Sequence, residues 1–253
     1  MNALIPWIGG KRLLRKEISK YVPRNINGYI EPFGGAGWML LYKNKWADLE
    51  VYNDLDNRLT NMFLQVKYHP EELEKELSLM LSSRTLFYQI ISQPGLTEIQ
   101  KAARFIYIIC KSFGSKGEHF GTSQTRGISS IQNRLDRIKD LNQRLDKVLI
   151  ENKTYQDILR LYDTKDNFFY LDPPYTEGCT YDNAKNFNHQ ELRDLLKKVK
   201  GRFILSYDDS PLVRELYAKF YYLPVVRIKG INRKEGKSDY NELIIANFPL
   251  EEK

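Results

Sequence analysis

Asp172, Pro173, Pro174 and Tyr175 end the apolar run that begins at Phe168. Neither proline can donate a backbone hydrogen bond to a sheet, so a strand should stop here. The Asp172 carboxylate and the Pro173 carbonyl are two rigidly held acceptors, and such a pair suits an NH₂ group with its two donors. Tyr175 adds a face on which a planar base can stack. We therefore expect these residues to hold a flipped nucleobase by its exocyclic amine, ready to attack an electrophile. A strand-ending turn with a solvated aspartate is the simpler alternative.

A glycine-rich turn and a later acid favour a second ligand, a nucleoside. The segment 28–37 (GYIEPFGGAG) predicts a short strand that runs into the turn, where glycines let a ligand approach the backbone. Asp54 lies at the end of the next predicted strand, 50–56, and its carboxylate can accept hydrogen bonds from ribose hydroxyls. This glycine turn is not followed by a phosphate-binding GK[ST] sequence, so the tail of the ligand need not be a phosphate. Trp7 and Lys11 flank another glycine pair before an amphipathic helix, although a packed tryptophan and a solvated lysine would look the same.

The elements that must position these residues alternate between strand and helix, which favours an α/β fold with a parallel, doubly wound sheet. Helices are predicted at 38–45 and around Leu59, Met62, Phe63 and Val66. From His69 to about Leu149, apolar residues recur at helical spacing around one polar loop; the last stripe comprises Ile131, Leu135, Ile138, Leu141, Leu145 and Val148, with Ser129 or Ser130 as a cap. Strand signals return at 147–159 and 167–175, followed by a helix at 188–199, a strand at 202–207, a helix after Pro211, and strands at 221–230 and 242–248. We therefore predict a discontinuous catalytic domain (1–67 and 148–253) interrupted by a helical, basic domain (68–147).

The positive charge is concentrated in that interruption. The chain of 253 residues has a formal net charge of +7, and residues 101–150 contain ten Lys/Arg against four Asp/Glu. A second basic cluster spans 227–237. Solvated faces are the plain alternative, but this concentration favours a polyanionic partner. Two distant cysteines, Cys110 and Cys179, suggest a reducing compartment, and the three histidines show no metal-ligand spacing. With no signal peptide or apolar run long enough for a membrane helix, we expect a cytoplasmic protein that requires no metal.

The ordered set PWIGGK, EPFGGAG, YNDLD and FYLDPPY resembles the Dam-type DNA adenine-N6 methyltransferases. The resemblance covers most of the predicted sheet and implies a Rossmann-like methyltransferase sheet of seven strands with a helical target-recognition insertion. It implies S-adenosyl-L-methionine (AdoMet) as the cofactor and double-stranded DNA as the partner. The implied cofactor-binding residues are Trp7, Lys11, Glu31, Phe33, Gly35, Asp54, Asp157 and Asp172. The implied catalytic residues are Asp172, Pro173, Pro174 and Tyr175, and the tail 232–248 looks like the family's closing hairpin.

The insertion departs from relatives that methylate GATC. Its loop, KSFGSKGEHFGTSQTRGISS (111–130), lacks their Asn-Gly and Pro-x-Gly elements, so the sequence does not predict GATC as the target. Candidate DNA contacts are Lys111, Lys116, Arg126, Asn133 and Arg134. Most of them should touch phosphates, and one or two should read base edges.

These observations predict a site-specific DNA adenine-N6 methyltransferase of a bacterium or its phage. An N4-cytosine methyltransferase shares the amine chemistry, although that class more often has serine in place of Asp172. The sequence is also compatible with an RNA base methyltransferase and with a catalytically inactive DNA-binding relative. No separate general base is apparent, so Asp172 or water is expected to take the proton. A restriction endonuclease is a candidate companion, and no obligate protein partner is evident.

Overall fold

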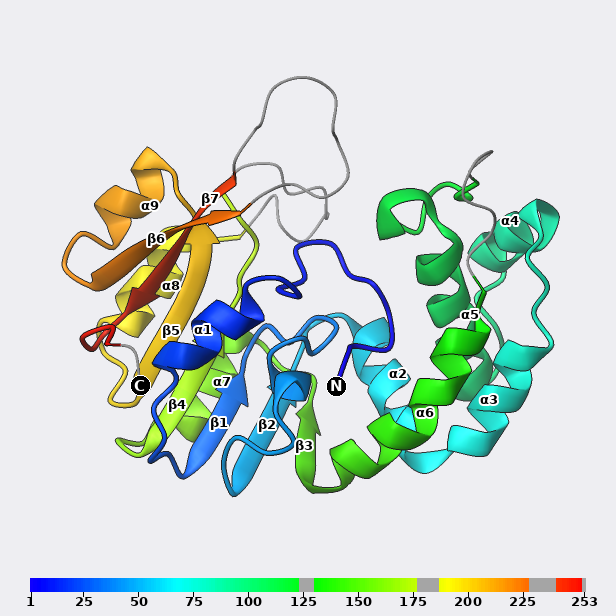
Figure 1. Ribbon diagram of the computed structural model, residues 1–253, viewed down its shortest axis with the longest axis horizontal. Helices are drawn as coiled ribbons and strands as arrows, with labels where there is room; N and C mark the ends of the chain where they lie inside the picture. The colour runs from blue at the N-terminus through cyan, green and yellow to red at the C-terminus, as the bar shows by residue number, and fades with distance from the viewer. Residues whose placement is uncertain (123–129, 177–186, 228–239, 252–253) are drawn as a thin grey trace. The chain divides into compact units, whose positions relative to one another are not determined.

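Seven strands form one mixed sheet in the order β3-β2-β1-β4-β5-β7-β6 (Figure 1). The computed structural model describes residues 1–122, 130–176, 187–227 and 240–251. The strands are β1 (Gly28–Glu31), β2 (Leu49–Asn53), β3 (Val148–Glu151), β4 (Asn167–Leu171), β5 (Arg202–Asp208), β6 (Tyr221–Arg227) and β7 (Tyr240–Ala246). β1, β4 and β5 run parallel, whereas β7 is antiparallel to both β5 and β6. The predicted α/β fold is confirmed, with the antiparallel pair at one edge.

The helices follow the predicted alternation in most places. They are α1 (Arg15–Tyr21), α2 (Asn57–Tyr68), α3 (Pro70–Ser78), α4 (Arg84–Ser92), α5 (Glu98–Lys111), α6 (Gln132–Arg144), α7 (Tyr155–Tyr162), α8 (His189–Leu196) and α9 (Pro211–Leu216). Short 3₁₀ turns are η1 (Leu40–Tyr42), η2 (Phe113–Ser115) and η3 (Leu145–Lys147). No helix in the described ranges is long and apolar enough to cross a membrane.

The chain divides into two compact units. The first unit comprises Met1–Arg12, Gly35–Lys45 and Val51–Asn152, and the second comprises Leu13–Gly34, Trp46–Glu50 and Lys153–Lys253. The whole predicted insertion, 68–147, lies in the first unit together with α2 and the N-terminal segment. The boundaries proposed from the sequence for a separate DNA-binding domain therefore stay a prediction.

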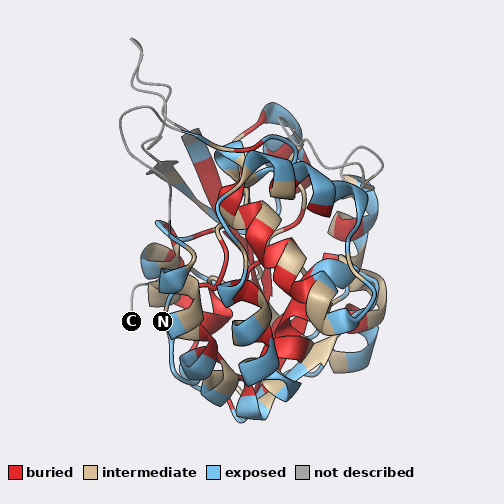
Figure 2. Cartoon of the chain, turned by 90° about the vertical axis from the view of Figure 1, so that its right-hand side faces the viewer, coloured by how far each residue is buried: buried red, intermediate tan, exposed pale blue. Residues whose placement is uncertain are grey.

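In the first unit, helices pack through apolar stripes. Thr97 and Gln100 form a reciprocal capping box that fixes the start of α5. α5 packs against α2, α3 and α4, and Figure 2 shows the buried residues as red bands along the helices. Ile138, Leu141 and Leu145 of the predicted α6 stripe are buried, as expected for the core-facing side. α6 begins without a side-chain cap at its N-cap residue, although the Ser130 hydroxyl accepts from the Gln132 amide; Ser129 lies outside the described residues.

In the second unit, β4 is buried along its whole length, which explains its continuous apolar sequence. Its neighbours on either side are β1 and β5, with Phe169 in register with Ile30 and with Phe203. Because these three strands run parallel, their carboxyl ends meet at one edge of the sheet. Polar residues that end these strands are thereby gathered at that edge.

Two predicted elements were wrong. The segment 38–45 forms only the 3₁₀ turn η1, and three consecutive residues, Met39, Leu40 and Leu41, are buried, which is not the spacing of an amphipathic helix. The strand predicted over 147–159 ends at Glu151, and α7 follows. The Thr154 side chain accepts a hydrogen bond from the Asp157 backbone N–H and thereby caps α7, so Asp157 lies in the first turn of a helix and not in a strand or loop.

Candidate active site

The turn after β4 holds Asp172 through a chain of hydroxyl groups. The Ser206 hydroxyl, from β5, donates to Asp172 Oδ1 at 3.0 Å. The buried Tyr170 hydroxyl lies 2.9 Å from the same serine oxygen and can donate to it. One carboxylate oxygen of Asp172 is thereby fixed in direction by a neighbouring parallel strand. Pro173 is buried beside it, and Pro174 is half-buried.

Tyr175 is held by β7, the last strand in chain order. Its hydroxyl donates to Glu242 Oε2 at 2.9 Å, and Glu242 is only 2% exposed. Burial, followed by the charges of Asp172 and Glu242, raises the pKa of Tyr175 well above its usual value. The phenol therefore stays protonated and keeps its donor role. Its ring lies 5.9 Å from the Tyr207 ring, centroid to centroid.

Thr176 provides a third connection. Its backbone N–H donates to Asp208 Oδ1 at 2.9 Å, and its hydroxyl donates to the other oxygen of the same carboxylate. Asp208 and Glu242 are register partners across β5 and β7, so two carboxylates face each other there. Like charges in this arrangement repel. Each receives a hydrogen bond from the turn, and the turn is thereby tied to both strands.

A continuous group of aromatic rings extends from this turn within the second unit. Phe33 contacts Tyr155 and Phe187, with centroid separations of 5.3 and 5.8 Å. Phe187 contacts His189, whose Nδ1 is hydrogen-bonded to the Tyr207 hydroxyl. The Tyr155 hydroxyl is buried and has no hydrogen-bond partner among the described residues. The group thus combines stacking faces with a polar atom that a planar, heteroatom-bearing ligand would satisfy.

In the first unit, the glycine turn, Asp54 and Trp7 come together. The Gly35 amide donates to Asp54 Oδ2 at 2.8 Å, and the Asp56 amide donates to Oδ1 at 2.9 Å. Gly35 has a φ of +51°, and a Cβ there would lie 3.1 Å from the Trp7 ring. Only glycine lets the turn adopt this conformation so close to the ring. A carboxylate has about four acceptor sites, so Asp54 keeps capacity to accept a hydroxyl.

The remaining predicted cofactor residues already have partners inside the protein. Lys11 is buried, and its ammonium donates to the Gly9 carbonyl at 3.0 Å. Glu31 is buried at the end of β1 and accepts from the Tyr29 hydroxyl at 2.7 Å. Asp157 is partly exposed and pairs with Arg160 at 2.9 Å. Their contacts with a cofactor stay a prediction.

The predicted DNA contacts differ in exposure. Lys116 and Asn133 are exposed, and Arg134 is half-buried on α6. Lys111 is only 4% exposed, and its ammonium donates to a serine hydroxyl at 2.6 Å within the first unit. Arg126 lies outside the described residues. Their DNA-binding role also stays a prediction.

Sequence reasoning missed three residues that hold the turn: Ser206, Asp208 and Glu242. Ser206 and Asp208 alternate at the end of an apolar strand, so both point to the same face. That period-two pattern was an available signal. Glu242 carried a weaker one, as a lone acid at the start of an apolar strand.

The α/β sheet carries carboxylate and carbonyl acceptors and an aromatic ring at the carboxyl end of β4, an arrangement that suits an exocyclic amine. The family of D12 class N6 adenine-specific DNA methyltransferases matches residues 7–231, and the chain belongs to this family. The predicted resemblance is thereby confirmed. The protein is a DNA-modifying enzyme that methylates adenine, with AdoMet as its methyl donor.

Curated relatives agree over nearly the whole chain. The type II methyltransferase M1.LlaDCHI of Lactococcus lactis subsp. cremoris is 26% identical, covering 96% of this chain and 94% of its own. The type II methyltransferase M.CviBI of Paramecium bursaria Chlorella virus NC1A is 23% identical, covering 98% and 100%. The DNA adenine methylase of Haemophilus influenzae is 26% identical, covering 95% and 91%.

Solved structures overlap with this chain only loosely. The C-terminal domain of precorrin-6Y C5,15-methyltransferase from Rhodobacter capsulatus covers 92% of this chain and 86% of its own, at 10% identity and a TM-score of 0.40. A TM-score at this level carries no functional conclusion.

Asp54 gives a pH-dependent prediction. Burial raises its pKa to about 6, and the hydrogen bonds from the Asp56 and Gly35 amides offset only part of this rise. Ionised Asp54 is the stronger acceptor, so lowering the pH from 7.5 to 5 should weaken AdoMet binding. One pH unit below the pKa, about a tenth of the groups are ionised, so the Kd for AdoMet should rise up to roughly tenfold. Calorimetric titrations with AdoMet across this range measure it.

The matched control is Asp54→Asn, which does not titrate. Its Kd for AdoMet should be weaker than the parent's at pH 7.5 and nearly flat between pH 5 and 7.5. If the variant keeps the parent's full pH dependence, Asp54 is not the titrating group.

Proposed function

We propose that methyl transfer takes place at the turn formed by Asp172, Pro173, Pro174 and Tyr175, with an adenine flipped out of duplex DNA as the substrate. The observation that carries this proposal is the tethering of the turn. Asp172, Tyr175 and Thr176 are each hydrogen-bonded to a different side chain of β5 or β7. A turn that merely ended a strand would need no such set of buried partners. The arrangement supports a preorganised binding site for one chemical group.

In this proposal the residues of the turn act on the amine. Asp172 and the Pro173 carbonyl accept the two N–H bonds of N6, which draws the nitrogen lone pair out of conjugation with the ring. Tyr175 stacks on the base and compensates for part of the stacking lost on flipping. Ser206 is a positioning residue that keeps one Asp172 oxygen from turning away. Holding the amine in a single orientation supplies the entropic share of catalysis.

AdoMet, when bound, supplies an electrophilic methyl group on a sulfonium. We propose Trp7, Lys11, Glu31, Phe33, Gly35, Asp54, Asp157 and Asp172 as its binding residues. The features that support this fit are the close approach of the Trp7 ring to Gly35, the Asp54 carboxylate with acceptor capacity left, and the aromatic group around Phe33 with its unpartnered Tyr155 hydroxyl.

DNA contacts are proposed at Lys116, Arg126, Asn133 and Arg134. Exposure supports Lys116 and Asn133, and the half-buried Arg134 lies on the same helix, α6, as Asn133. Lys111 stays in the proposal as the weakest member, because its ammonium is already bonded inside the protein. The enzyme would act wherever its host keeps DNA, in the cytoplasm of a bacterium or a phage-infected cell. Since two of the relatives are named type II methyltransferases, a companion restriction endonuclease is a further part of the proposal.

The test is to identify the product. The purified enzyme is incubated with AdoMet and unmethylated plasmid DNA, and the DNA is digested to nucleosides for mass spectrometry. We expect N6-methyladenosine in its deoxy form and no methylated cytosine. N4-methyldeoxycytidine alone would overturn the adenine assignment. Equal labelling of RNA and duplex DNA by tritiated AdoMet would overturn duplex DNA as the preferred substrate.

A further inference from the structure

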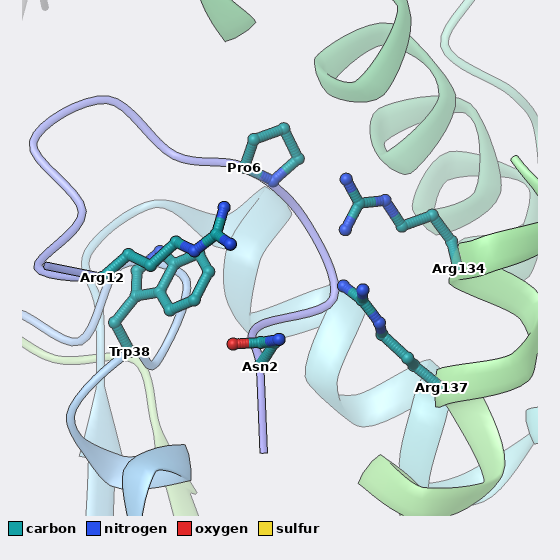
Figure 3. A pocket seen from close by; sticks show the side chains of 6 residues that line it. All are labelled: Asn2, Pro6, Arg12, Trp38, Arg134 and Arg137. Carbon is teal, nitrogen blue, oxygen red and sulfur yellow. The ribbon is translucent and has the colours of Figure 1, made fainter. Parts of the chain in front are cut away.

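A pocket of about 130 Å³ lies in the first unit, between the N-terminal segment and α6 (Figure 3). It is lined by Asn2, Pro6, Arg12, Trp38, Arg134 and Arg137. Three of these six residues are arginines, and none is acidic. Arg134 and Arg137 are three positions apart on α6, so they share one side of the helix. Arg12 reaches the pocket from the opposite wall (Figure 3).

Within the described ranges, none of the three guanidinium groups forms an ion pair with a carboxylate. Asp136 attracts Arg137 electrostatically, and Arg134 is hydrogen-bonded to Cys110, which is not an acidic side chain. Arg137 donates to the Ala3 carbonyl at 3.3 Å, which fixes its direction without cancelling its charge. The acid that follows Arg134 by two positions, Asp136, is exposed and accepts from Gln132. Burial and the charges of the two neighbouring arginines lower the pKa of Arg137, yet arginine remains charged at any physiological pH.

Converging arginines differ from a solvated basic face. On such a face, long cationic side chains spread apart to reduce their repulsion, whereas here three extend toward one space. The Trp38 ring forms part of the wall and is held close to the backbone, because a Cβ on Gly10 would lie 2.6 Å from its Nε1. An apolar wall lowers the local dielectric and strengthens the attraction of the pocket for an anion. Guanidinium forks match the oxygens of a phosphate in geometry as well as charge.

We propose that Arg12, Arg134 and Arg137 clamp one phosphate group of the DNA backbone. The inference rests on the proposed function, since it assumes that the enzyme binds duplex DNA. It assigns Arg134 to the phosphate backbone and not to a base edge, and it adds Arg12 and Arg137, which the sequence did not indicate. A phosphate contact fixes the register of the protein on the duplex and carries no sequence information. The clamp would therefore support binding equally at target and non-target sites.

The test uses salt dependence, which counts neutralised phosphates. Binding of fluorescently labelled duplexes is measured by anisotropy without AdoMet, over a range of KCl concentrations. The pocket variant is Arg12→Gln/Arg134→Gln, and it leaves Arg137 in place because of its bond to Ala3. The control is Lys75→Gln/Lys139→Gln, which removes the same charge from exposed positions outside the pocket. We expect the pocket variant to lower the slope of log K against log [KCl] by about 0.9, the value for one phosphate on duplex DNA.

The affinity loss should be the same for duplexes of unrelated sequence, and the control should keep the parent's slope. A pocket variant that matches the control in slope and affinity would overturn the clamp. A fall in slope of about 1.8 or more would also overturn it, because the arginines would then hold separate phosphates. A loss of affinity confined to one DNA sequence would mean that Arg134 contacts a base edge and not the phosphate backbone.

A second measurement separates this inference from the proposed function. Inorganic phosphate at constant ionic strength should raise the Tm of the parent and leave that of the pocket variant unchanged. If the parent binds no DNA at all, the proposed function fails, and the response to phosphate still decides whether the pocket takes this group. If phosphate stabilises the parent but the pocket variant binds DNA as tightly as the parent does, the pocket takes free anions only and the DNA clamp is wrong.

Discussion

Asp172→Asn is expected to slow methyl transfer about 100- to 1000-fold, the range for removing one preorganised polar group from an active site. The substitution keeps the size of the side chain but replaces one acceptor oxygen with an NH₂ group. Because Ser206 donates to one oxygen at 3.0 Å, we expect the other oxygen to accept from the substrate amine. An asparagine that satisfies Ser206 therefore presents donors to a substrate amine that is itself a donor.

Initial rates with tritiated AdoMet measure the loss, and anisotropy with labelled duplex measures binding. DNA affinity should stay within about twofold of the parent, since no phosphate contact is removed. Asp166→Asn is the matched control, because Asp166 is exposed and lies just before β4. That control should retain the parent's rate. A loss below tenfold for Asp172→Asn would show that this carboxylate does not orient the amine.

Tyr175→Ala should lower kcat/KM for DNA roughly 5- to 150-fold further than Tyr175→Phe does, because base–aromatic stacking is worth about 1–3 kcal/mol. Tyr175→Phe keeps the ring and loses only the hydrogen bond to Glu242. Its loss should be smaller, about fivefold, which corresponds to about 1 kcal/mol for one hydrogen bond. Steady-state rates on unmethylated plasmid DNA of mixed sequence provide both values.

Variants of Glu242 separate the effect of positioning the Tyr175 ring from the effect of its stacking on the base. Glu242→Gln and Tyr175→Phe alter the same hydrogen bond, so their losses should not add in the double variant. Additive losses would mean that Glu242 acts on something other than Tyr175. Equal losses for Tyr175→Ala and Tyr175→Phe would contradict stacking, because the ring itself would then contribute nothing.

The sheet could be predicted because its strands carry local signals. β4 is continuously apolar and ends at two prolines, and β5 is apolar up to Ser206. The helical character of 68–147 was also local, in the spacing of residues such as Ile138 and Leu141. The errors in secondary structure occurred where tertiary packing, and not the local sequence pattern, decides the conformation. Residues 38–45 have a helical composition, but they fill the core with a single tight turn.

At α7 the missed signal was short-range. Thr154, followed three residues later by Asp157 and then by Ile158 and Leu159, is a helix-start pattern, with the two polar side chains bonded to each other. The apolar residues of this segment favoured a strand because the prediction did not take the Thr154 cap into account. A capping signal should therefore outweigh a short apolar run.

The residues of the active-site turn could be predicted from the sequence, but the side chains that hold the turn in place could not. Asp172 and Tyr175 stand in one short motif, whereas Ser206 and Glu242 follow 34 and 67 positions after their respective partners. Pairings at such separations depend on strand order and register, which a single sequence does not reveal. The arginine pocket is similar: Arg12 and Arg134 look like two unrelated surface charges until the fold brings them together.

The position of β7 has a consequence for biosynthesis. This strand, Tyr240–Ala246, lies between β5 and β6 in the sheet although it follows both in the sequence, and it carries the partner of Tyr175. A ribosome must therefore synthesise the chain through Glu242 before the Tyr175 ring can be fixed in place. Incomplete chains that end before Glu242 would lack the strand that orients this ring.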